Sequence, residues 1–100
     1  MTSMKENTLY LVWHKKDGTK VKLGKLWSEE KKYYFMYLQD DAKMAMEDGF
    51  KLLENFPSVG VSYFREEMFM TFKSLKKSNG EDEFEALEGT EVRTDLYLEK

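Results

Sequence analysis

Residues 8–38, TLYLVWHKKDGTKVKLGKLWSEEKKYYFMYL, decide the fold because they read as three strands joined by two short turns. Apolar side chains alternate along residues 8–14, 20–27 and 32–38, and a period of two residues is typical of strands. In residues 8–14 both alternating sets are mostly apolar, which indicates a central strand covered on both faces. We therefore expect a three-stranded antiparallel meander.

Two local signals set the geometry of this meander. Asp17-Gly18 lies between the first two strands, and such a pair supplies the positive φ angle that a tight hairpin turn requires. The alternation slips at Gly24, after which Leu26 falls out of phase with Leu23. A β-bulge at Gly24 would return Leu26 to the buried face.

Helical signals dominate the middle of the chain. A short helix over residues 40–48 is expected to start at a capping Asp40 or Asp41 and to end at Gly49. The strongest helical pattern covers residues 65–77, where apolar side chains recur at intervals of three and four. Its apolar face consists of Met68, Phe69, Phe72 and Leu75.

Three further segments complete the predicted fold. Residues 50–56 are extended and apolar, and they form either a strand or an ordered crossing segment. Residues 81–88 predict a short helix that ends at Gly89 and turns Phe84 and Leu87 inward. Residues 92–98 predict a last strand, with Leu96 and Leu98 on one face.

Together these elements predict an α+β fold. A small antiparallel β-sheet of three to five strands would pack against one main α-helix, residues 65–77, with one or two short helices beside it. The 100 residues suit a single domain over residues 8–100, preceded by a flexible polar tail over residues 1–7. A hydrophobic content of 41% is enough for a core and too high for a disordered chain.

The composition excludes several classes of function. The absence of cysteine excludes disulfides and thiolate sites, and the single histidine, His14, excludes any site that needs two imidazoles. No apolar run approaches the roughly 20 residues of a membrane-spanning helix. The first residues are polar where a secretory signal would be apolar, so we expect a cytoplasmic protein.

No set of residues in the sequence forms a recognisable catalytic site. His14 reads as a surface histidine at a turn, and Asp40-Asp41 and Glu66-Glu67 read as acidic residues at helix starts. A glycine-rich phosphate loop and a Gly-x-Ser-x-Gly context are both missing. We therefore expect a protein that is not an enzyme and has no metal or cofactor.

Charge is distributed unevenly along the chain. The formal net charge is −3, but residues 81–99 hold eight acidic residues against Arg93 alone. Such a run is either a solvated surface or a field that attracts a basic partner. We take it as the candidate partner-binding segment, with Phe84 as an apolar anchor among the acidic side chains: Glu81, Asp82, Glu83, Phe84, Glu85, Glu88 and Glu91.

Two other features bear on binding. The only basic cluster lies in the first hairpin, where it forms either a solvated surface that blocks edge pairing or a nucleic-acid footprint: Lys15, Lys16, Lys20, Lys22 and Lys25. Six Tyr, seven Phe, two Trp and seven Met are a large number for one small core. They are either all core residues or a surplus that contacts another protein.

The order of segments resembles the N-terminal subdomain of HipA-type kinase toxins over residues 9–77. Leu23-Gly24-Lys25-Leu26 is similar to the second strand of that subdomain, and Tyr33-Tyr34-Phe35-Met36-Tyr37 to the strand after it. The apolar stretch 50–57 and the helical stretch 63–75 follow in the same order. Leu75 is followed by Lys76 where the family has a leucine-proline pair.

The resemblance implies a small adaptor without catalysis, since the family's catalytic residues lie in a kinase core. In HipA-type toxins this subdomain contributes to antitoxin contacts, and a free-standing version acts as the antitoxin of a shortened kinase. We therefore expect a bacterial or phage protein that binds a protein partner, as a toxin–antitoxin component or a kinase-regulating adaptor. The alternative is a phage-type inhibitor of a host nucleic-acid enzyme, and a third reading is direct nucleic-acid binding by the lysine-rich hairpin.

Overall fold

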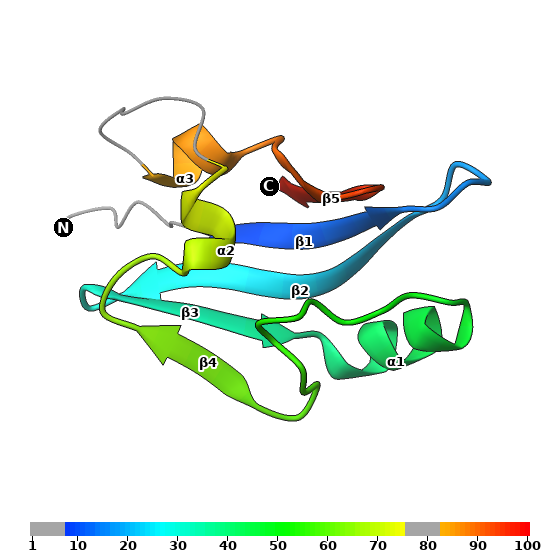
Figure 1. Ribbon diagram of the computed structural model, residues 1–100, viewed down its shortest axis with the longest axis horizontal. Helices are drawn as coiled ribbons and strands as arrows, with labels where there is room; N and C mark the ends of the chain where they lie inside the picture. Colours follow the sequence, from blue (N-terminus) through cyan, green and yellow to red (C-terminus); the bar gives the residue numbers. More distant parts are fainter. Residues whose placement is uncertain (1–7, 76–82) are drawn as a thin grey trace, which may run out of the picture.

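The computed structural model describes residues 8–75 and 83–100, which form one curled antiparallel sheet with short helices (Figure 1). Six strands lie in the spatial order β4-β3-β2-β1-β6-β5. Their bounds are β1 (Thr8–His14), β2 (Lys20–Glu29), β3 (Lys32–Tyr37), β4 (Ser62–Arg65), β5 (Glu91–Arg93) and β6 (Leu96–Glu99). The helices are α1 (Gln39–Glu47), α2 (Met70–Lys73) and α3 (Glu83–Leu87).

The predicted meander β1-β2-β3 is confirmed. β1 lies between β2 and β6, which makes it central as expected. Leu11 pairs with Gly24 and Val12 with Lys22, so Leu23 is the extra residue of a β-bulge. This bulge, predicted from the slip at Gly24, puts both Leu23 and Leu26 in the core, where each is fully buried.

Both turns of the meander use positive φ angles. Gly18 has a φ of 92°, and the Lys15 N–H donates to the Thr19 carbonyl across the first turn at 2.8 Å. The second turn puts Glu30 at a φ of 51° and Lys31 at 67°. Two consecutive positive φ angles match the twist of a two-residue hairpin, although side chains other than glycine are sterically disfavoured there.

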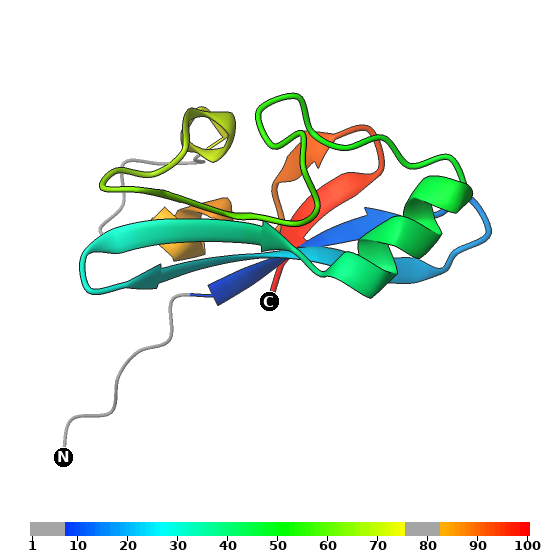
Figure 2. The ribbon, with the colours of Figure 1, turned by 90° about the horizontal axis from the view of Figure 1, so that it is seen from below.

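The sheet curls around a core that lies on its inner face (Figure 2). The segment between α1 and β4 crosses this face and contributes Phe50, Leu53 and Phe56 to the core. Phe72 of α2 and Phe84 of α3 add to the same cluster. Every described helix and the crossing segment therefore supply core residues to the same side of the sheet. The curled sheet has the shape of a half-barrel.

Tyr37 fastens the crossing segment to the sheet. Its side chain is fully buried, and its hydroxyl donates to the Phe56 carbonyl at 2.7 Å and accepts from the Leu53 N–H at 3.0 Å. Burial raises the pKa of the Tyr37 hydroxyl to about 12. Residues 50–56 are therefore an ordered crossing segment rather than a strand, which is one of the two predicted alternatives.

The short helix after β3 is confirmed, but its predicted cap is not. The N-cap residue of α1 is Leu38, which makes no side-chain capping bond, and Asp40 and Asp41 lie in the first turn. Carboxylates in the first turn stabilise a helix, because they interact favourably with the positive end of the helix dipole. Gly49 follows the C-cap Asp48 with a φ of 103°, as expected of a helix-ending glycine.

The predicted main helix over residues 65–77 is wrong. Residues 62–65 form β4, which pairs with β3, and α2 contains only four residues. The apolar spacing still marked core residues, because Met68, Phe69 and Phe72 are all buried. They reach the core from a bend and one helical turn, so burial rather than helical periodicity explains their pattern.

The expected α+β fold with three to five strands on one main helix is therefore corrected. The described chain is mostly an antiparallel sheet of six strands, and the longest described helix has nine residues. The predicted last strand over residues 92–98 is two strands, β5 and β6, because Asp95 turns the chain with a φ of 65°. The predicted tail over residues 1–7 lies outside the described residues.

Candidate partner-binding surface

The outer face of the sheet carries a row of three aromatic side chains. Trp27 lies opposite Tyr34 in the β2–β3 register, and Tyr34 lies opposite Phe64 in the β3–β4 register. Because residues directly opposite in antiparallel strands share a face, the three rings stand side by side. We call Trp27, Tyr34 and Phe64 the aromatic row, and Phe64 is 62% exposed.

Neighbouring rings of the aromatic row pack against each other, and Trp27 and Tyr34 are stacked. The Trp27 and Tyr34 centroids are 5.2 Å apart with planes 11° from parallel, and Tyr34 and Phe64 are 6.2 Å apart. The Lys25 ammonium lies 5.0 Å from the Trp27 ring, and the Lys32 ammonium lies 5.7 Å from the Phe64 ring. These cation–π contacts place a positive charge near each end of the row.

A second row continues the outer face toward β1. Tyr10 lies opposite Lys25, which in turn lies opposite Met36. The Lys22 ammonium is 4.4 Å from the Tyr10 ring. Val12, on the same face, is only 3% exposed although no described helix covers it. Neighbouring side chains on the sheet therefore shield it from solvent. The outer face therefore combines aromatic, methionine and lysine side chains.

His14 closes this face beside β6 and is not a free surface histidine. Its Nε2 atom lies 2.6 Å from an oxygen of Glu99, and its ring centroid lies 4.5 Å from that of Tyr97. Both side chains of the His14–Glu99 pair are about one-third exposed, at 30% and 31%. The pair links the end of β1 to β6. The sequence alone does not indicate that Glu99 is the partner of His14.

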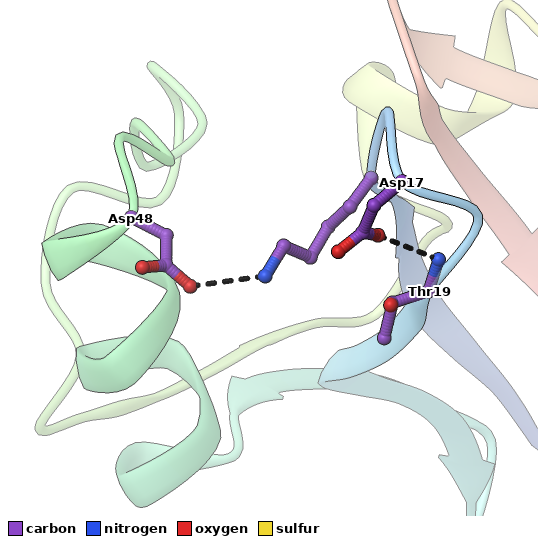
Figure 3. A network of polar contacts seen from close by, with 4 residues as sticks. Asp17, Thr19 and Asp48 are labelled. Atoms are coloured by element: carbon purple, nitrogen blue, oxygen red, sulfur yellow. Dashed lines mark hydrogen bonds and ion pairs between the residues drawn. The ribbon is translucent and has the colours of Figure 1, made fainter.

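One lysine of the lysine-rich hairpin is paired with a carboxylate. The Lys15 ammonium pairs with Asp48, the C-cap residue of α1, at 3.1 Å (Figure 3). In the turn, the Thr19 N–H donates to Asp17 at 2.9 Å, and this bond holds the pKa of the Asp17 carboxyl below its usual value. Only Lys22 and Lys25 of the predicted cluster join the aromatic side chains described above.

The acidic candidate segment is only partly described. Glu81 and Asp82 lie outside the described residues, and the side chains of Glu83 and Glu85 are likewise not described. Phe84, the expected apolar anchor, is 6% exposed and packs against Tyr33 with centroids 6.2 Å apart, so it contributes to the core instead.

Glu88 and Glu91 are the acidic candidates whose side chains can be placed. A Glu88 oxygen lies 3.6 Å from the Lys100 ammonium, and Glu91 is exposed on β5. The structure therefore leaves these two carboxylates at the surface, near the end of the sheet opposite β4.

Two hollows in the described surface contain neither serine nor cysteine. One, of about 390 Å³, lies between β4 and α2, and its only charged lining residue is Arg65. The other, of about 450 Å³, lies by the first hairpin, where His14 and Lys15 are already paired with carboxylates. Neither hollow contains a serine, and the chain has no cysteine, so neither offers an activated nucleophile of these types.

Within residues 8–75 and 83–100, no three His, Asp or Glu side chains gather in a way that could hold a metal ion. No helix in this part of the chain is long and apolar enough to cross a membrane.

Sequence reasoning identified the surplus of aromatic residues but not where they gather. The signal that could have located them was the β2–β3 register, which follows from the Glu30-Lys31 turn and sets Trp27 opposite Tyr34. The sequence does not predict Phe64 on this face, because the apolar spacing from residue 65 onward indicates a helix and no pattern indicates β4.

No protein-family model, curated protein or solved structure matches this chain. Its proposed function therefore rests on the surface described above and on the sequence.

Proposed function

We propose that this chain is a non-catalytic module that binds another protein through the outer face of its sheet. The observation that carries this proposal is the aromatic row of Trp27, Tyr34 and Phe64. These rings form a connected patch on the side of the sheet opposite the crossing segment and the core.

The chemistry of the outer face suits a protein interface. Tyrosine and tryptophan combine a large apolar area with one polar group, and such residues are enriched where proteins meet. Met36 lies beside them in the register and is half-buried, and its flexible side chain can adapt to an incoming surface. Phe64, at 62% exposed, leaves the largest apolar area of the row for a partner to cover.

The resemblance to the N-terminal subdomain of HipA-type kinases suggests the kind of module. A toxin–antitoxin component or a kinase-regulating adaptor would use such a face to hold a kinase-like protein. The strand Tyr33-Tyr34-Phe35-Met36-Tyr37, on which part of that resemblance rests, contributes Tyr34 and Met36 to the outer face.

A second candidate is a phage-type inhibitor that uses its acidic segment against a nucleic-acid enzyme. The observation in its favour is the exposed carboxylate of Glu91 together with the partly exposed Glu88. In this case, replacing Asp82, Glu83 and Glu85 by Asn or Gln would slow association with a basic partner and flatten its salt dependence.

Affinity capture from the source cells distinguishes the two candidates. Phe64→Asp should abolish recovery of the partner captured by wild type, and the Asp82→Asn, Glu83→Gln, Glu85→Gln variant should retain it. Met44→Asp is the matched control, because Met44 is 66% exposed on α1. Loss of the partner in the triple variant, with retention in Phe64→Asp, would overturn the proposal in favour of the acidic segment.

A further inference from the structure

Resting on the proposed function, we propose that the outer face binds an acidic protein surface, in which Asp and Glu side chains surround an apolar centre. Three lysines carry the inference: Lys22, Lys25 and Lys32. Each places its ammonium 4.4–5.7 Å from the centroid of an aromatic ring on this face. The surface is therefore an apolar patch with three lysines at its margins, and Glu29, opposite Lys32 in the β2–β3 register, is the carboxylate that lies next to one of them.

No ion pair joins these three lysines to a carboxylate that the structure describes. Within residues 8–75 and 83–100, leaving aside the side chains of Glu83 and Glu85, no Asp or Glu oxygen lies within 4.0 Å of any of the three ammoniums. Three lysines elsewhere do have such partners: Lys15 pairs with Asp48, Lys73 with Glu67 and Lys100 with Glu88. Carboxylates of a partner would complete ion pairs that the described chain leaves open, and covering the patch would reduce solvent screening of those pairs.

The orientation of the rings favours a protein over a single-stranded nucleic acid. A base stacks on an exposed ring face, and aromatic platforms that bind single strands offer such faces. Here Tyr34 covers one face of Trp27, and Lys25 lies over the Trp27 ring as well. The most exposed ring of the row is Phe64, which suits contacts with aliphatic and aromatic side chains.

The same charge argues against a second copy of this chain as the occupant. A two-fold contact through this face would set Lys22, Lys25 and Lys32 of one copy against the same lysines of the other. Like charges brought together in an interface oppose association, whereas an acidic partner removes this repulsion.

The test is a titration that follows the fluorescence of Trp27 in a Trp13→Phe background, so that one indole reports. Three probes are compared: a peptide of Glu and Leu residues, its Gln-for-Glu counterpart, and a 12-nucleotide oligothymidylate. Two variants are compared with wild type. The first combines Lys22→Gln, Lys25→Gln and Lys32→Gln. The control combines Lys43→Gln and Lys51→Gln, at exposed lysines elsewhere.

We expect the acidic peptide to bind at least tenfold more tightly than the Gln peptide, and the triple variant to lose that advantage. The control variant should bind as wild type does. Tighter binding of the oligonucleotide than of the acidic peptide would overturn the proposal in favour of a nucleic-acid partner.

Two further outcomes separate this proposal from the proposed function. Equal binding of the acidic and Gln peptides, or no binding of the acidic peptide, would refute an acidic partner. The capture experiment with Phe64→Asp would still decide whether the outer face binds a protein. A dimer at the titration concentration, measured by light scattering and abolished by the triple lysine variant, would instead assign the face to a second copy and overturn the proposal.

Discussion

Trp27 and Tyr34 lie stacked across β2 and β3, with ring centroids 5.2 Å apart and planes 11° from parallel. An aromatic cross-strand pair stabilises a sheet by about 0.2–1 kcal/mol, which is small beside the burial of a core side chain. The pair therefore contributes more to the shape of the outer face than to folding.

Two phenylalanines should differ sharply in their contribution to stability. Phe72 is fully buried among Phe35, Phe56 and Phe69, so Phe72→Ala should destabilise the protein by about 3–5 kcal/mol. Phe64 is 62% exposed, and Phe64→Ser should cost under about 1 kcal/mol. Urea titrations of both variants measure the difference, and equal losses would show that Phe64 is part of the core.

Gly24 should not accept even a methyl group. A Cβ atom placed there would lie 2.9 Å from the Phe35 ring and 3.2 Å from the Met36 carbonyl oxygen. Phe35 is fully buried and packed against other rings, so it has little room to move. Gly24→Ala should therefore cost about 1–3 kcal/mol from overpacking, measured by denaturant unfolding. A neutral effect would indicate that the bulge can shift.

Tyr37→Phe should test how the crossing segment is held. Removing the hydroxyl leaves the Leu53 N–H and the Phe56 carbonyl without the partner they share, and both bonds are buried. We expect a loss of about 1–3 kcal/mol, measured by urea unfolding at neutral pH. Faster amide hydrogen exchange at Leu53 should accompany it, and unchanged exchange there would contradict this account.

The same residue predicts a dependence of stability on alkaline pH. Burial raises the pKa of Tyr37 from 10.0 to about 12, so the folded protein holds this proton more tightly than the unfolded chain does. Its contribution is complete below about pH 10 and is lost as the pH rises toward 12. The stability difference between wild type and Tyr37→Phe should therefore shrink over this range, and a constant difference would refute the role of burial.

The turn between β2 and β3 should be open to improvement. Glu30 and Lys31 both have positive φ angles, which asparagine and glycine adopt at lower cost. The double variant Glu30→Asn, Lys31→Gly should therefore raise the melting temperature, with a gain of about 1 kcal/mol or less in stability. A lower melting temperature would mean that the two native side chains make contacts that outweigh the backbone strain.

The sequence predicted the meander well because its signals are local. Alternation, the Asp17-Gly18 turn and the slip at Gly24 each involve neighbouring residues, and each corresponds to a feature of the fold. β4 was missed because Ser62–Arg65 is short, and its pairing with β3 spans a long stretch of chain. The apolar spacing after it resembled a helix, although the buried side chains reach the core from a bend and one turn.

The candidate site was harder to predict because faces depend on register. Trp27, Tyr34 and Phe64 come from three strands, and their meeting requires the pairing of β4 with β3. Charge along the sequence drew attention to residues 81–91 instead, where Phe84 is in fact a core residue. Linear charge patterns record neighbours in the chain, whereas this surface is built from neighbours across the sheet.

The central claim is that a partner covers the outer face, and site-specific photocrosslinking in the source cells tests it most directly. A photoreactive phenylalanine analogue placed at Phe64 should yield a crosslinked adduct with one discrete protein. The same analogue at Met44, which is equally exposed on α1, should yield none. An adduct formed from Met44 or from Glu91 but not from Phe64 would contradict the account.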